Sequence, residues 1–264
     1  MNKTVKGLIS YTADTLGKEK PRTIFLICYI AFTLFSTVYF AVLGHARNAL
    51  LPIPYAALFI VGLFLLEYFL DVRCPLGFLL VLFFVPIGGI LGTCYDVYSL
   101  IPVFDTVLHT VSGFIFAALG YGLMNRILMR KDVPSKLATL LFAFAFSLAI
   151  AVLWEMFEWL LTAVMRGDMQ EDGLVTDIFS YFPTGSHNEV FELLDIEKTE
   201  IYYSGGKVYT VEGGYLDLGL FDTLLDMLVC LIGDVVFLVT GLFGLSGKRD
   251  PLLRLTPTPC RVFL

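Results

Sequence analysis

Residues 137–165 read LATLLFAFAFSLAIAVLWEMFEWLLTAVM, a long apolar run without a single Lys or Arg. The hydrocarbon core of a bilayer is about 30 Å thick, so a helix needs roughly 20 apolar residues to cross it. Five further runs meet this requirement, and they cover residues 23–43, 50–70, 75–95, 105–124 and 220–243. The sequence therefore predicts an all-α fold, a polytopic transmembrane helix bundle with six spans.

The composition supports this class of protein. Of the 264 residues, 57% are hydrophobic and only 16% are charged, which excludes an ordinary soluble domain. The alternating segments of about ten residues that build outer-membrane barrels are absent, so helices are the structure that satisfies the backbone hydrogen bonds in lipid. We expect the lipid bilayer as the partner of this chain and no nucleic acid.

The distribution of positive charge predicts the orientation. If the N-terminus lies inside, only four basic residues fall outside, namely Arg47, Arg166, Lys198 and Lys207. The other fourteen fall on the inner side: Lys3, Lys6, Lys18, Lys20, Arg22, Arg73, Arg126, Arg130, Lys131, Lys136, Lys248, Arg249, Arg254 and Arg261. Because cytoplasmic segments carry an excess of Lys and Arg, this bias predicts that both termini are cytoplasmic (N-in/C-in).

The spans and loops divide the chain into five predicted regions. Residues 1–22 form a cytoplasmic N-terminal segment, 23–165 hold spans 1 to 5, 166–219 form an extracytoplasmic insert, 220–243 form span 6 and 244–264 form a cytoplasmic tail. Residues 1–20 are compatible with a short helix on the inner membrane surface and with a disordered tail.

The insert is strongly acidic. Residues 166–219 hold eleven Asp or Glu against three Lys or Arg, a local charge of −8 (3 − 11). Within it, Thr199–Tyr203 and Lys207–Val211 are β-prone runs separated by Ser204, Gly205 and Gly206. Paired glycines supply the positive φ of a tight turn, so this pattern predicts a β-hairpin. A cap over the span ends and a loop without function both fit the insert.

Ionisable groups inside the spans cluster on spans 4, 5 and 6. Inserting such a group costs about 2.5–3.5 kcal/mol, so each is a candidate for function. They form pairs separated by three or four residues: Asp105 and His109, Glu155 and Glu158, and Asp222 and Asp226. This spacing puts both members of a pair on one helix face. From the helical rise, all three pairs are expected at similar depth near the outer leaflet.

Several carboxylates at one place cannot all stay ionised unless positive charge joins them. Shared protons, an arginine from a loop (Arg47 or Arg166) or a bound cation would each provide it. Carboxylate oxygens with one imidazole suit Mg²⁺, Mn²⁺ or Zn²⁺. We therefore predict a divalent-cation site and no other cofactor. The predicted metal ligands are Asp105, His109, Glu155, Glu158, Asp222 and Asp226, and the candidate catalytic residues are His109, Glu155 and Glu158.

Structural roles compete with these functional ones. Asp105 and Asp222 are also placed to cap the N-termini of their helices, where a carboxylate accepts backbone N–H groups and favours the helix dipole. Trp154 and Trp159 flank the two glutamates and are expected to anchor span 5 at the membrane interface.

Two acidic residues lie deeper in the predicted spans. Asp234 and Glu67 could mark a proton or cation path; alternatively, Asp234 pairs with a nearby hydroxyl and Glu67 reaches the inner surface. No span is visibly broken by Gly or Pro at mid-depth, and the third span comes nearest, with Pro86 and three glycines. Small residues on span 4 would let a neighbouring helix approach closely: Ser112, Gly113, Ala117 and Gly120.

Three motifs resemble the YjdF-type family of bacterial inner-membrane proteins: DTVLHTVSG at 105–113, WEMFE at 154–158, and DTLLD at 222–226 with Gly233 following. More distantly, they are similar to VanZ-like proteins, which share an Asp-x-x-x-His helix, a Glu-bearing helix and a late Asp-bearing helix. The resemblance covers roughly residues 50–165 and 220–245. It implies a multi-pass protein of the bacterial cytoplasmic (inner) membrane. It supplies no reaction, and the Gln that commonly follows the Glu of VanZ-like proteins is missing.

Three functions are compatible with these observations. The first is a divalent-cation-dependent membrane enzyme, a hydrolase or transferase that acts on a lipid or envelope precursor and uses His109 as ligand or general base. The second is a proton or cation transporter or channel with Asp234 as a deeper station. The third is a non-catalytic membrane scaffold or envelope-stress partner that uses the acidic insert as its docking surface.

Overall fold

The computed structural model describes residues 5–128, 135–165, 168–244 and 251–259. Seven of the basic residues used to predict the orientation lie outside the described residues, and Arg166 was also a candidate to neutralise the carboxylates. The seven are Lys3, Arg130, Lys131, Arg166, Lys248, Arg249 and Arg261. The chain divides into two compact units. The first comprises Met1–Ala151 and Leu228–Leu264, and the second comprises Val152–Met227.

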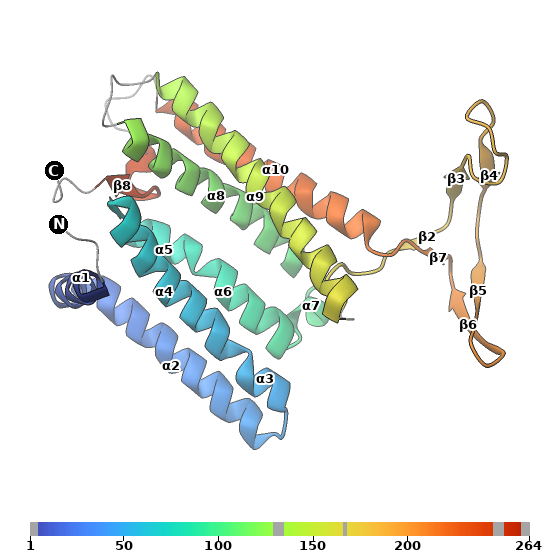
Figure 1. Cartoon of the computed structure of the whole chain (residues 1–264), viewed down its shortest axis with the longest axis horizontal. Coiled ribbons are helices and arrows are strands. Elements are labelled where there is room, and N and C mark those ends of the chain that lie inside the picture. Colours follow the sequence, from blue (N-terminus) through green and yellow to red (C-terminus); the bar gives the residue numbers. More distant parts are fainter. Residues whose placement is uncertain (1–4, 129–134, 166–167, 245–250, 260–264) are drawn as a thin grey trace. The chain divides into compact units, whose positions relative to one another are not determined.

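Six helical segments of the described chain are long and apolar enough to cross a membrane, which confirms the predicted number. The first is α2 (Lys20–Val42), and the second combines α3 (Ala46–Leu50) with α4 (Pro52–Leu70). The third combines α5 (Leu76–Leu82), α6 (Phe84–Gly89) and the π-helix η1 (Ile90–Cys94). The short α7 (Val97–Leu100) precedes the last three (Figure 1): α8 (Phe104–Leu128), α9 (Lys136–Met165) and α10 (Leu220–Phe243).

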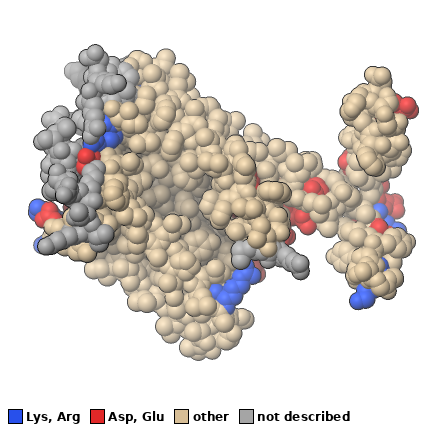
Figure 2. Space-filling view, in the orientation of Figure 1, with Lys and Arg blue, Asp and Glu red and all other residues tan. Residues whose placement is uncertain are grey.

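The surface of these helices suits a hydrocarbon environment. Val42, Leu58 and Leu141 are 81%, 75% and 53% exposed. Figure 2 shows that, on the face in view, the surface of the helical part is almost entirely free of charged side chains. Soluble monomers rarely expose apolar patches larger than a few hundred Å², so a surface of this kind indicates helices that face lipid.

The third span is distorted but continuous, as expected from the sequence: Phe83, between α5 and α6, keeps α-helical dihedral angles (φ −60°, ψ −25°), and the backbone N–H of Ile87 still donates to the carbonyl oxygen of Phe83 (3.1 Å). α5 ends at Leu82, and α6 begins at Phe84, so that Pro86 falls in the first turn of α6. Proline has no N–H, and its ring clashes with the carbonyl of the residue four positions earlier, which here is Leu82. The first turn of a new helix tolerates proline because its N–H groups have no intrahelical partner. After Gly89 the chain continues as a π-helix, a form found frequently at functional sites.

The N-terminal segment forms a helix, α1 (Val5–Lys18), rather than a disordered tail. Polar contacts hold it to the rest of the first unit. The Tyr11 hydroxyl donates to the Glu67 carboxylate (3.2 Å), and Nη1 of Arg73 donates to the Tyr11 hydroxyl (2.8 Å) and to Thr15 Oγ1 (3.2 Å). Arg73 also forms an ion pair with Glu19 (2.5 Å).

Glu67 is the centre of this network. Its two oxygens accept hydrogen bonds from the two terminal nitrogens of Arg22 (2.8 and 2.9 Å), and one also accepts the Cys74 backbone N–H (2.8 Å). Because Glu67 is only 1% exposed, the interpretation that it reaches the inner surface is wrong. Arg22 lies inside the first candidate span because α2 begins at Lys20, three residues before the predicted run 23–43.

Close approaches between helix backbones organise the first unit. α2 packs on α4, α4 on α6, and α6 on α8. A Cβ atom on Gly113 of α8 would collide with the carbonyl oxygen of Cys230 on α10, and one on Gly233 of α10 would collide with the carbonyl oxygen of Thr110 on α8. A Cβ atom on Gly120 would lie 2.9 Å from the ring of Phe146 on α9. The predicted small-residue side of span 4 is therefore a helix-packing surface.

The end of the chain returns to the first unit. β8 (Thr258–Pro259) pairs antiparallel with β1 (Val72–Arg73), after the 3-10 turn η2 (Pro251–Arg254). Leu252 and Thr256 are 0% and 1% exposed, so this segment is part of the core. Both α1 and β8 thus contact Arg73, which places the two terminal segments at the same end of the first unit, as an even number of spans requires.

The described residues of the second unit include six short strands in three antiparallel pairs. β2 (Leu174–Val175) pairs with β7 (Tyr215–Leu216), β3 (Ile178–Ser180) with β4 (Phe191–Leu193), and β5 (Lys198–Tyr203) with β6 (Lys207–Glu212). The last pair confirms the predicted hairpin. Its turn glycines, Gly205 and Gly206, have φ angles of 84° and 69°, which other residues adopt only with strain.

Candidate functional site

Three buried carboxylates meet in the second unit. Glu155 and Glu158 lie on α9 and Asp226 on α10, and each offers one oxygen that lies within 4.8 Å of the other two. The three residues are 5%, 7% and 3% exposed. The spacing of three residues places both glutamates on one face of α9. The structure therefore brings together three of the residues predicted from their spacing.

A tryptophan orients one of these carboxylates. Nε1 of Trp154 donates a hydrogen bond to Oε1 of Glu158 (2.8 Å), one helical turn further along α9. Trp154 and Trp159 are 42% and 60% exposed, as expected for residues that anchor a helix at an interface. The prediction that Trp154 anchors the helix at the interface did not include its hydrogen bond with Glu158. The four-residue spacing between the two residues favours that contact.

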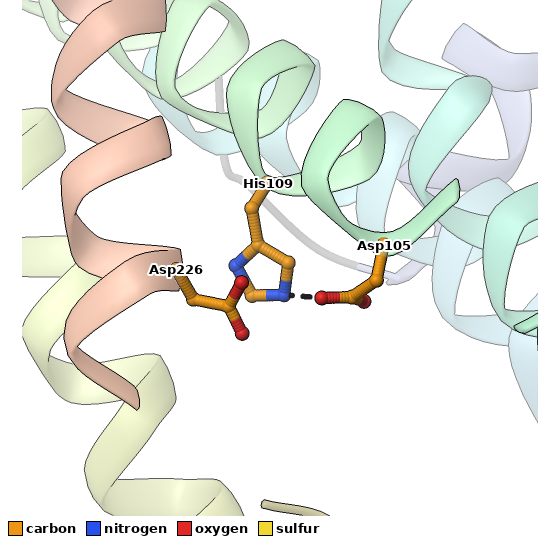
Figure 3. Close-up of side chains that lie close together, drawn as sticks. All are labelled: Asp105, His109 and Asp226. Atoms are coloured by element: carbon orange, nitrogen blue, oxygen red, sulfur yellow. Dashed lines mark ion pairs between the residues drawn. The ribbon is translucent and has the colours of Figure 1, made fainter. Parts of the chain in front are cut away.

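The second predicted pair lies in the first unit, at the start of α8. Nε2 of His109 lies 3.7 Å from Oδ1 of Asp105, one turn earlier on the same helix (Figure 3). The imidazole is 13% exposed and the carboxylate 33% exposed. A carboxylate at one ring nitrogen sets the orientation and tautomer of an imidazole, which is how proteins prepare a histidine for metal binding or proton transfer.

Cys230 fixes the position of His109 relative to α10. Its thiol donates to the carbonyl oxygen of His109 (3.2 Å) and lies 3.9 Å from Nδ1 of the same residue. Cys230 is 4% exposed. It is not among the predicted site residues, and its position one turn after Asp226 on α10 is the signal in the sequence that could have identified it.

A carboxylate that was not predicted caps α10. Asp217 accepts the backbone N–H groups of Phe221 (2.7 Å), Gly219 (3.2 Å) and Gly173 (2.7 Å). Burial by itself raises the pKa of Asp217, but these backbone hydrogen bonds outweigh it and lower the pKa below its ordinary value. Asp217 thus stabilises both the start of α10 and the strand region that leads to it.

Asp105 and Asp222 are not N-cap residues, so the prediction that they occupy the N-cap positions of their helices is wrong. α8 begins at Phe104 and α10 at Leu220, which places both carboxylates within the first helical turn. They remain favourably placed in the field of the helix N-terminus. Asp222 also accepts the backbone N–H of Glu171 (3.1 Å), and it does not belong to the group of three carboxylates.

The three carboxylates are close enough for their charges to interact strongly. Carboxylates this close repel one another unless protons or a cation reduce their charge. Oxygens that bind one Mg²⁺ at about 2.1 Å lie at most about 4.2 Å apart, so a separation of up to 4.8 Å requires only small movements of the side chains.

Comparison with known proteins gives one match. A family model described as "Predicted membrane protein (DUF2238)" matches residues 22–246, which include all six candidate spans apart from the first residues of α2. No curated protein and no solved structure matches the chain. The match supports an uncharacterised family of membrane proteins, whereas the YjdF-type and VanZ-like resemblances stay predictions.

Proposed function

The chain belongs to this family of predicted membrane proteins, and on that premise we propose that its function depends on a divalent cation held by Glu155, Glu158 and Asp226. The observation that carries the proposal is the approach of these three buried carboxylates to within 4.8 Å. Carboxylate oxygens are the ligands that Mg²⁺ and Mn²⁺ prefer. Inward-facing carboxylates with an i, i+3 spacing are also typical of metal sites in helical bundles.

The proposal gives His109 and Asp105 a role in the same chemistry. Asp226 precedes Cys230 by one turn of the continuous helix α10, and the Cys230 thiol contacts His109. The residue types support His109 as a further ligand or as a general base, with Asp105, 3.7 Å from its ring, setting its tautomer. With an imidazole among the ligands, Zn²⁺ becomes a third candidate.

The activity we propose is hydrolysis or group transfer on a lipid or envelope precursor. A cation bound here would act as a Lewis acid and would make bound water a stronger nucleophile. The chain's own residues would hold the cation, orient the imidazole and accept a proton at His109. A substrate with a lipid tail is supported by the location of Glu155, Glu158 and Asp226 on helices that qualify as membrane spans, since such a substrate is concentrated in the bilayer.

Metal analysis of the purified protein tests this proposal. We expect protein that is stripped with a chelator, reloaded with Mn²⁺ and desalted to retain about one ion per chain. Glu155→Gln and Asp226→Asn should each weaken Mn²⁺ binding about tenfold or more, since they remove one of three charged ligands. Asp222→Asn is the matched control, because Asp222 lies on the same helix but outside the group.

Two results would contradict the proposal. One is wild-type protein that retains no Mn²⁺, Mg²⁺ or Zn²⁺ while it remains folded by circular dichroism. The other is loss of the ion in Asp222→Asn to the same extent as in Glu155→Gln, which would indicate a different binding place.

Transport of protons or cations is a second candidate, and the π-helical part of the third span favours it. π-helical segments are frequent at functional sites, and the third span is π-helical over Ile90–Cys94. Flux into proteoliposomes that falls in Asp226→Asn and Asp234→Asn would favour transport over enzymatic activity. Flux that is unchanged by both substitutions would argue against it.

A further inference from the structure

Asp234 is a buried acid in the middle of α10. It lies fourteen residues after Leu220 and nine before Phe243, so it is about 21 Å from one end of the helix and about 14 Å from the other. The residue is 0% exposed. Within the described part of the chain, neither of its carboxylate oxygens has a hydrogen-bond partner. A buried carboxylate in this situation is costly as an anion and becomes neutral instead.

The hydrogen bonding of Ser147 determines which form of Asp234 it can stabilise. Ser147 of α9 lies beside Asp234, and its hydroxyl donates to the carbonyl oxygen of Gly113 on α8 (2.9 Å). A hydroxyl has one proton to donate, and a carbonyl oxygen can only accept. Because this proton is directed to Gly113, it leaves both oxygens of Asp234 without a donor among the described residues.

Few titratable groups face Asp234 from the helices packed against it. The adjoining stretch of α8 (110–118) and that of α9 (140–151) contain no titratable side chain. Further along α8, Tyr121 contacts Phe237, which lies one turn after Asp234 (5.9 Å between ring centroids). On α10, Cys230 lies one turn before Asp234, and its thiol is directed to His109. None of these is a fixed cation that could balance a carboxylate.

From this geometry we infer that Asp234 is an intramembrane proton-binding site, a carboxylic acid kept neutral because it is fully buried and the adjoining stretches of α8 and α9 supply no cation. This inference deepens the transport candidate of the proposed function, on which it rests, by naming the group that binds the proton, and it does not depend on the divalent cation. A neutral acid in the packed core of α8, α9 and α10 is a group that can take up and release a proton between two aqueous sides, as proton relays in membrane proteins do.

A hydrophobic carbodiimide tests the inference, because it reacts only with protonated carboxylic acids. The acid proton moves to a carbodiimide nitrogen, the carboxylate oxygen bonds to the central carbon, and rearrangement gives a stable N-acylurea without a leaving group. We expect dicyclohexylcarbodiimide to modify Asp234 at neutral pH in the full-length protein in nanodiscs, as located by peptide mass spectrometry. Modification should fall several-fold as the pH is raised, and a water-soluble carbodiimide should not reach Asp234.

Variants and cations separate this site from the carboxylate group. Asp234→Asn should lose the adduct yet keep a thermal midpoint within a few degrees of the wild type, because the amide has nearly the same size and is neutral like the protonated acid. Mn²⁺ should protect Glu155, Glu158 and Asp226 without protecting Asp234. An absence of adduct at Asp234 even at mildly acidic pH would overturn the inference. Protection of Asp234 by Na⁺ at fixed pH would also overturn it, since a metal cation would then be the ligand.

Discussion

Glu67 connects three segments of the first unit through its hydrogen bonds with Arg22, Tyr11 and the Cys74 backbone. Both members of the Arg22–Glu67 pair are buried, with side chains 2% and 0% exposed. Removing one partner of such a pair leaves an uncompensated buried charge, which typically costs about 3–5 kcal/mol. We therefore expect Glu67→Gln to lower the free energy of unfolding by that amount, measured by denaturant titration in detergent micelles.

Glu19→Gln is the matched control for this substitution. Glu19 also pairs with Arg73, but its side chain is 43% exposed, and exposed pairs contribute about 0–1 kcal/mol. If Glu67→Gln were no more destabilising than Glu19→Gln, the charge on Glu67 would not be needed, and the network would be a packing feature rather than an electrostatic one.

At the level of single residues, the sequence predicts which groups share a helix face but not what they contact. The i, i+3 spacing of Glu155 and Glu158 is sufficient to place both on one side of α9. The partners of Glu67 could not be predicted, because Tyr11 and Arg22 are 56 and 45 residues away in the chain. Asp217 was missed for a related reason: its role as a cap depends on where α10 begins, and helix ends are the least certain part of a prediction.

Among the helices, the contact between α8 and α10 depends on glycine at position 113. A Cβ atom there would collide with the Cys230 carbonyl oxygen, which is backbone and cannot move aside. We expect Gly113→Ala to destabilise the protein by about 1–3 kcal/mol, the usual cost of overpacking. The measurement is thermal unfolding in detergent, followed by size-exclusion chromatography.

Gly62→Ala should have the opposite sign and serves as its control. Gly62 lies within α4, and a Cβ atom there would meet nothing within 4 Å. Alanine is favoured over glycine in a helix interior by roughly 1 kcal/mol, so Gly62→Ala is expected to be neutral or stabilising. Equal destabilisation by both substitutions would show that close approach at Gly113 is not the cause.

The helices themselves were largely predictable, because span length and hydrophobicity are properties of local sequence. The third span was the exception. Its composition indicates a single helix, and the chain does stay helical, but Pro86 interrupts the hydrogen-bond ladder between α5 and α6, and the span ends as a π-helix. Proline in a membrane helix can produce a mild kink or a break, depending on whether neighbouring helices satisfy the freed backbone groups. That outcome depends on packing, which one sequence does not reveal.

For the molecule as a whole, the two terminal segments are parts of the fold rather than appendages. α1 and β8 both contact Arg73, and the buried Leu252 and Thr256 extend the core toward the end of the chain.

The insert of the second unit presents exposed aromatic side chains among its acidic ones, and Phe182 and Tyr202 are 93% and 75% exposed. A scaffold function would use this surface, and deletion of residues 168–217 would then abolish activity while the span carboxylates remained dispensable.

The positive-charge bias makes a prediction about how the whole molecule lies in its membrane. We propose that both termini are cytoplasmic and that the insert lies outside, because fourteen of the eighteen Lys and Arg residues then fall on the inner side. Ser135 and Ser204 are both exposed and are separated by one candidate span, α9. In a cysteine-free background, a membrane-impermeant maleimide added to intact bacterial cells should label Ser204→Cys, and it should label Ser135→Cys only after the cells are permeabilised. The reverse pattern would invert the orientation, and labelling of both in intact cells would mean that α9 does not cross the membrane.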